Sequence, residues 1–169
     1  ATAPYEKLIQ IPTKVSSSTF KQNLSKLKPG DQIDGFNVEG DFIWGSSKRP
    51  RLLLAAGIGI TPFRSMLLQR AHDNKPFNTT LVYSTRAVPL FKTEFDRLAK
   101  ADPSLQADYL PGGRIEISKK STLAPFWLRN MVYISGPEEM VRELSRQLVK
   151  QGLPREQIRQ DLFTGRVDY

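Results

Sequence analysis

Short apolar runs alternate with amphipathic stretches along most of the chain, and this alternation predicts the class of fold. Strands are predicted at the short apolar runs 51–56, 80–84, 107–110, 131–135 and 159–163. Helices are predicted where apolar side chains recur at helical spacing, over 62–71, 91–100 and 137–151. Strands that alternate with helices of about 10–15 residues are typical of βαβ units. The pattern therefore predicts an α/β fold with a parallel sheet of about five strands flanked by helices.

The first fifty residues follow a different pattern. A short helix is predicted to begin after Ser18, its N-cap, and to stop at Pro29. On either side, residues 8–12 and 32–44 carry the apolar side chains and glycines of β segments. The polar, turn-rich stretch 45–50 then separates this part from the alternating pattern. We expect a domain boundary there.

Composition narrows the chemistry that this chain can perform. Its 169 residues are 39% hydrophobic and include no cysteine, which excludes disulfides, thiolate zinc sites and a cysteine nucleophile within it. The single histidine, His72, excludes a multi-histidine metal centre, so we expect no metal site. The longest uncharged apolar run, Leu52 to Ile60, has nine residues. A bilayer span needs roughly 20, so no membrane-spanning helix is expected.

The chain is basic, with 25 lysines and arginines against 17 acids and a formal net charge of +8. Such a field favours anionic partners, which include phosphorylated cofactors, nucleic acid, anionic lipid and acidic proteins. The basic residues are scattered, and they do not interleave with aromatic residues as in RNA-binding segments. We therefore expect no nucleic-acid partner.

The first candidate site is a glycine turn that follows an apolar strand. It comprises Gly57, Ile58, Gly59, Ile60, Thr61 and Pro62. Thr61 is predicted to cap a helix whose first position is Pro62. Glycines allow a tight turn and a close approach of the backbone, and a helix N-terminus favours a phosphate. The third glycine of the dinucleotide fingerprint is absent, so a merely structural turn stays the alternative.

Two further strand ends carry candidate residues. The second strand ends at Ser84 and Arg86, and an arginine in this place suits the 2′-phosphate of NADP, with a solvated surface arginine as the alternative. The later strand 131–135 runs into Gly136 and Pro137 and then a helix. Because the carboxyl ends of parallel strands meet at one edge, these junctions predict a crevice for a nucleotide.

Together these residues resemble the ferredoxin–NADP reductase superfamily of flavin-dependent NAD(P)H oxidoreductases. The resemblance is carried by motifs that stand in the family's order, at residues 55–62, 113–115, 135–140 and 152–163. It implies a Rossmann-like NAD(P)-binding domain over 50–169. It also implies that residues 1–46 are the C-terminal part of a flavin-binding domain, a partial antiparallel β-barrel, because Ala1-Thr2-Ala3-Pro4 matches only the end of the family's flavin motif.

The resemblance also implies roles for residues. NADP or NAD would be held by the glycine turn, by Ser84 and Arg86, and by Gly136, Pro137 and Met140. Ser135 stands where the family has a cysteine beside the nicotinamide, and Asp161 stands where it has an acid near the flavin, so these two are the expected catalytic residues. FAD is expected in the intact protein, in which a hydride would pass from nicotinamide to flavin.

The family's members differ in what receives the electrons. The resemblance implies either an acidic electron carrier or an upstream membrane haem domain as the partner. It places the protein in the cytoplasm, or on the cytoplasmic side of a membrane-anchored protein. The alternative function is an NAD(P)-binding module without turnover, which the serine at position 135 and the partial flavin motif motivate.

Overall fold

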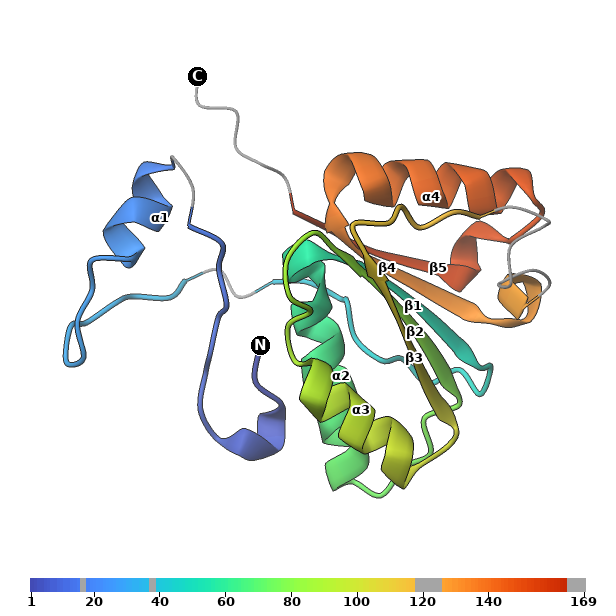
Figure 1. Ribbon diagram of the computed structural model, residues 1–169, viewed down its shortest axis with the longest axis horizontal. Coiled ribbons are helices and arrows are strands. Elements are labelled where there is room, and N and C mark those ends of the chain that lie inside the picture. The colour runs from blue at the N-terminus through green and yellow to red at the C-terminus, as the bar shows by residue number, and fades with distance from the viewer. Residues whose placement is uncertain (16–17, 37–38, 118–125, 164–169) are drawn as a thin grey trace.

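A five-stranded parallel sheet forms the centre of the computed structural model, which describes residues 1–15, 18–36, 39–117 and 126–163 (Figure 1). Its strands lie in the order β3-β2-β1-β4-β5, and every neighbouring pair is parallel. Their bounds are β1 (Arg51–Ala56), β2 (Thr79–Thr85), β3 (Leu105–Pro111), β4 (Met131–Pro137) and β5 (Ile158–Phe163). The chain thus builds outward from β1 to β3 and then crosses to the other side of β1.

Helices cover both faces of the sheet (Figure 1). The helices α2 (Ile60–His72) and α3 (Lys92–Ala101) lie on one face, and α4 (Glu138–Lys150) lies on the other. Alternate side chains of β1 supply two separate cores: Leu53 packs with the α2–α3 side and Leu54 with the α4 side. The predicted α/β fold with a parallel five-stranded sheet is therefore confirmed.

Most element boundaries fall within a few residues of the predicted ones. Gly152 follows α4 with a φ of +96°, a left-handed conformation that ends the helix at the predicted place. Trp127 is buried in the core beneath α4. None of the helices in the described residues is both long and apolar enough to cross a bilayer.

The segment before the sheet departs from the prediction. It holds a 3₁₀ turn, η1 (Pro4–Glu6), and the short helix α1 (Thr19–Leu24), for which Ser18 is the N-cap as predicted. The strands predicted at 8–12 and 32–44 are wrong for the described residues there, which form no strand. A strand needs a hydrogen-bonded neighbour, and here Ile9 and Phe36 are instead 89% and 82% exposed.

An arginine of α2 attaches the start of this segment to the helices α2 and α3. Arg64 contacts Glu6 of η1 at 3.0 Å and Glu94 of α3 at 2.8 Å. Burial lowers the pKa of the Arg64 guanidinium, but hydrogen bonds to Glu94 and Glu6 outweigh burial and raise it. The same contact holds the pKa of the Glu6 carboxyl below its usual range. Ala3, buried beside this cluster, completes the attachment.

A second arginine fixes the residues that enter the sheet. Arg51, buried at the start of β1, donates hydrogen bonds to the carbonyl oxygens of Trp44, Gly45, Ser47 and Arg49. Tyr133 of β4 donates a further hydrogen bond to the Trp44 carbonyl oxygen at 2.5 Å. The predicted boundary stretch is therefore a well-bonded turn packed against the sheet.

Candidate functional site

The candidate site lies at the carboxyl edge of the sheet, where β1 and β4 are neighbours. The chain leaves β1 towards α2 on one face and leaves β4 towards α4 on the other, so the two connections diverge at this point. Open parallel sheets bind ligands at such a switch point. Strand register brings Ala55, Ser135 and Asp161 into one row across β1, β4 and β5.

The predicted glycine turn forms the β1 side of this site. Residues Gly57 to Gly59 make a 3₁₀ turn, η2, that leads directly into α2. Gly57 has a φ of +54°, and a Cβ atom placed on it would meet nothing within 4 Å. The backbone is therefore open to a ligand there. The Ile60 N–H already donates to the Gly57 and Ile58 carbonyl oxygens, so η2 and α2 form one continuous helix, and its positive N-terminal end lies at this opening.

The start of α2 corrects the sequence prediction in detail. The helix begins at Ile60 with Gly59 as its N-cap, so Thr61 does not cap it and Pro62 is not its first residue. The reason is that η2 continues straight into the helix and leaves no extended residue at Thr61. Pro62 is tolerated because an N–H in the first helical turn has no intrahelical acceptor.

Close packing joins the two loops across the switch point. A Cβ atom on Gly59 would lie 2.2 Å from the carbonyl oxygen of Ser135, so only glycine fits between η2 and β4. On the other side, a Cβ atom on Gly136 would lie 2.9 Å from the Met140 side chain and 3.1 Å from the Ala56 carbonyl oxygen. The Met140 side chain therefore lies against the β4 turn.

The two predicted catalytic residues contact one another. Ser135 is 0% exposed, and its hydroxyl donates a hydrogen bond of 2.9 Å to the Oδ2 atom of Asp161. Both side chains point to the face of the sheet that α2 covers, because Ser135 alternates with residues of the α4-side core. Asp161 is half-buried, so the pair presents its carboxylate, not the serine hydroxyl, towards solvent.

The end of β2 forms the remaining part of the site. Ser84 donates a hydrogen bond to the Gly113 carbonyl oxygen, and Gly112 donates one to the Thr85 carbonyl oxygen at 2.7 Å, which ties the β2 and β3 ends together. Arg86 follows on the surface and has no acidic partner among the described residues. Its guanidinium is therefore available to an anion beside the neighbouring end of β1.

The sequence analysis did not identify the arginine that positions the glycine turn. Arg64 lies in α2 just after this turn, and its contacts with Glu6 and Glu94 fix the helix whose N-terminus faces the site. The sequence does contain a signal for this role, because Arg64 stands among the apolar residues Phe63, Leu67 and Leu68, which form the buried side of the helix.

The comparisons with known proteins agree with this geometry. The model of the oxidoreductase NAD-binding domain family matches residues 53–146, more than half of the chain. A flavohemoprotein of Pseudomonas putida is 30% identical over 150 residues, which are 82% of this chain and 38% of the relative. The chain spans less than two fifths of the length of the curated relatives that it matches.

Solved structures share the fold. The flavohem-like FAD/NAD-binding domain of nitric oxide dioxygenase from Vibrio cholerae has a TM-score of 0.61 and 24% identity, and the match covers 74% of this chain and 55% of that one. A ferredoxin–NADP⁺ reductase from Plasmodium falciparum has a TM-score of 0.62 and 15% identity over 86% of this chain and 65% of that one.

Proposed function

This chain belongs to the oxidoreductase NAD-binding domain family of the ferredoxin–NADP reductase superfamily, and on that basis we propose that it binds NAD(P)H for hydride transfer to a flavin. The observation that carries the proposal is the contrast between two glycines. Gly59 is locked against β4, whereas Gly57 faces open space next to the N-terminus of α2. One glycine joins the two loops, and the other leaves room for a pyrophosphate.

The residues around this opening fit a dinucleotide. Gly57, Ile58 and Gly59 would bind the pyrophosphate together with the backbone of Ile60 and Thr61. Gly136 and Pro137 would line the nicotinamide side. Ser84 and Arg86 would bind the adenosine end, where a free guanidinium on the surface suits a 2′-phosphate.

Asp161 and Ser135 would act at the nicotinamide end. A flavin such as FAD, when bound, supplies the hydride acceptor. The Ser135 hydroxyl would orient the Asp161 carboxylate through their hydrogen bond of 2.9 Å, and the carboxylate would be the group that faces the reacting rings. Ser135 is thus proposed as a positioning residue for Asp161.

We assign residues 1–46 to the flavin domain of the proposed reductase and residues 50–169 to its nucleotide domain. Apolar side chains exposed along the first segment support this division, since a barrel would bury them. The electron acceptor would be a haem domain, as the flavohemoprotein relatives suggest, or an acidic carrier attracted by the charge of +8. Such a reductase would work in the cytoplasm.

Calorimetric titration with 2′-phospho-AMP and with AMP tests the nucleotide site without requiring flavin. We expect the 2′-phosphorylated compound to bind more tightly. Replacing Arg86 by alanine should remove about 1.5–3 kcal/mol of its binding free energy, roughly a 10- to 150-fold loss, because a charge-assisted contact disappears. AMP affinity should hardly change. Arg97→Ala, which removes an exposed arginine of α3, is the matched control.

Two results would contradict the proposal. Equal losses for AMP and 2′-phospho-AMP in Arg86→Ala would show that Arg86 does not contact the 2′-phosphate. Failure of both compounds to bind the unmodified chain would show that the glycine turn is only structural.

A further inference from the structure

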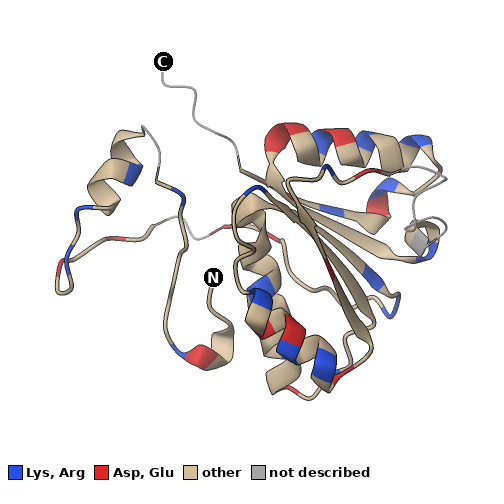
Figure 2. Cartoon of the chain, in the orientation of Figure 1, with Lys and Arg blue, Asp and Glu red and all other residues tan. Residues whose placement is uncertain are grey.

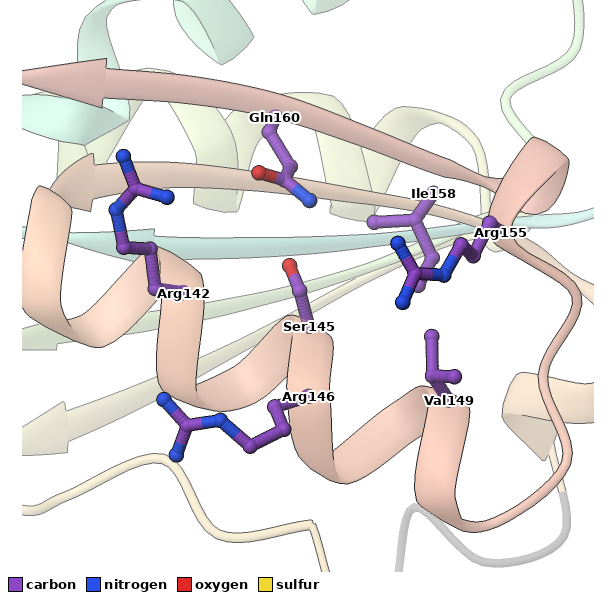
Figure 3. A pocket seen from close by; sticks show the side chains of 7 residues that line it. All are labelled: Arg142, Ser145, Arg146, Val149, Arg155, Ile158 and Gln160. Carbon is purple, nitrogen blue, oxygen red and sulfur yellow. The ribbon is translucent and has the colours of Figure 1, made fainter.

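A second candidate site lies on the opposite face of the sheet, in a groove between α4 and the edge strand β5 (Figure 3). The groove has a volume of about 380 Å³, within the usual range for small-molecule pockets. It is lined by Arg142, Ser145, Arg146, Val149, Arg155, Ile158 and Gln160. Gln160 alternates along β5 with Asp161, so the sheet itself separates this groove from the nucleotide site.

The groove contains a buried hydroxyl that has no hydrogen-bond partner among the described residues. Ser145 is only 8% exposed, and its Oγ atom makes no hydrogen bond to any other described residue. Buried polar groups are nearly always hydrogen-bonded, because an unpaired one costs free energy. Figure 3 shows the Ser145 side chain directed towards Gln160 across the groove. The hydroxyl is therefore placed to donate to a group that enters between them.

Arginines surround this hydroxyl. Figure 3 places the guanidinium groups of Arg142 and Arg155 on opposite sides of the gap between Ser145 and Gln160. Arg142 is paired with Glu138 at 2.7 Å, and Arg146, on the outer side of the helix, is paired with Glu143. Arg155, in the 3₁₀ turn η4 (Arg155–Gln157), is exposed and has no acidic partner among the described residues. Its charge is therefore free to bind an anion.

We infer that this groove binds the phosphate group of a small organic phosphate. A guanidinium, a serine hydroxyl and a glutamine amide can all donate hydrogen bonds, and a phosphate has enough acceptor oxygens to take them together. A monocarboxylate offers only two oxygens. Val149 and Ile158 give the groove an apolar portion, which suits the carbon skeleton of an organic phosphate.

The distribution of charge agrees with a local site. Lysines and arginines occur on the α-helices and on β1 and β5 but not on β2, β3 or β4, and acids are interspersed with them along α4 (Figure 2). Because Arg142 and Arg146 are paired with acids of α4, Arg155 is the arginine of the groove that has no acidic partner among the described residues. The recess of about 380 Å³ lies within the range of small-molecule pockets, which favours a small molecule as its occupant.

Ribose 5-phosphate is a suitable probe, because it carries a phosphate but neither adenine nor nicotinamide. Titrated into the isotope-labelled chain, it should produce saturable NMR shifts at the amides of Ser145, Arg155 and Gln160, whereas ribose should produce none. Inorganic phosphate is titrated in the same way for comparison. Tighter binding of ribose 5-phosphate would assign the site to an organic phosphate, and equal binding would assign it to the free ion.

Three variants distinguish specific phosphate binding in the groove from general attraction of phosphate to a basic protein. Arg155→Glu should abolish binding, and Ser145→Ala should weaken it about two- to tenfold because one hydrogen bond is lost. Arg97→Glu makes the same charge change on α3, at the opposite face, and should leave binding nearly unchanged. The melting temperature of Ser145→Ala should be equal to or above that of the unmodified chain, since the hydroxyl has no partner to lose.

Several results would overturn the inference. The first is the absence of saturable shifts at the groove with either phosphate. The second is an equal loss of binding in Arg97→Glu and Arg155→Glu, which would indicate non-specific attraction. The third is a lowered melting temperature with unchanged phosphate affinity in Ser145→Ala, which would make the hydroxyl structural. The inference does not rest on the proposed nucleotide function, which the adenosine compounds test separately.

Discussion

At the scale of single residues, Gly57 and Gly59 perform opposite tasks although only one residue separates them. Gly59 is required by packing, because a Cβ atom would lie 2.2 Å from a backbone oxygen of β4. Gly57 is favoured by its φ of +54° and by the open space above it. One turn thus contributes both to the stability of the fold and to the proposed binding site.

Substitution by alanine should separate these tasks. We expect Gly59→Ala to lower the free energy of unfolding by about 2–3 kcal/mol, because β4 must move to admit the methyl group. Gly57→Ala should cost only about 1 kcal/mol, the strain of a left-handed alanine, but it should weaken nucleotide binding. Urea denaturation measures the first effect and calorimetry the second. Equal stability losses in the two variants would contradict the packing argument.

The contact between Ser135 and Asp161 makes a second prediction at this scale. Replacing Ser135 by alanine and Asp161 by asparagine, singly and together, gives a double-mutant cycle. We expect a coupling of about 1–2 kcal/mol in the free energy of unfolding, since a hydroxyl donates to a carboxylate in a partly buried place. Additive effects within a few tenths of a kcal/mol would show that the two side chains act independently, and would remove the basis for a positioning role.

At the scale of elements, the sequence predicts well where its signals are local. The strands of the sheet, their helices and the glycine junctions follow from apolar runs, helical spacing and turn residues, and all of them form. Strand register then brings Ser135 beside Asp161 across β4 and β5. This contact could not be derived from spacing alone, because 26 residues separate the two side chains.

The predictions are wrong where an element depends on contacts with residues that are distant in the sequence. Residues 8–12 and 32–44 have strand-like composition, but a strand forms only when another strand is hydrogen-bonded to it. The exact start of α2 depends on how η2 packs against β4, which no local pattern encodes. The groove beneath α4 was not predicted either, because its arginines come from α4 and η4 and are ordinary surface residues in the sequence.

The attachment of η1 to α2 should depend on pH. Contact with Arg64 depresses the pKa of Glu6, so the ionised carboxylate favours the attached state. Its stabilising effect should be complete above the unfolded value, about 4.3, and should disappear as the pH falls through the lower folded value. Glu6→Gln should therefore be less stable than the unmodified chain at neutral pH and equally stable in strong acid.

Urea denaturation at several pH values measures this difference. Glu116→Gln, a change at an exposed acid without an ion pair among the described residues, is the control and should show no such pH-dependent gap. If the gap between Glu6→Gln and the unmodified chain persisted unchanged below the folded pKa of Glu6, the carboxylate would not be the source of the stabilisation.

At the scale of the whole molecule, the described residues divide into a hydrogen-bonded sheet and a segment with few internal contacts. In β1 and β4 the backbone is paired on both sides and lies between two cores. The amides of 11–15 and 32–36 donate no hydrogen bond to other described residues, and Ile11 and Ile33 are exposed. The two parts should therefore open with very different free energies.

Amide hydrogen exchange followed by mass spectrometry measures that difference. We expect the amides of Leu53 and Ile134 to exchange only on global unfolding, and hence at least about a thousand times more slowly than those of 11–15 and 32–36. The exchange rates of the α2 amides should lie between these two, because this helix is hydrogen-bonded but only one of its faces is buried against the sheet. Strong protection within 32–36 would contradict this division, because it would mean that these amides are hydrogen-bonded in a strand. Weak protection there, with a protected sheet, would locate the stability of the chain in the sheet and the helices that cover it.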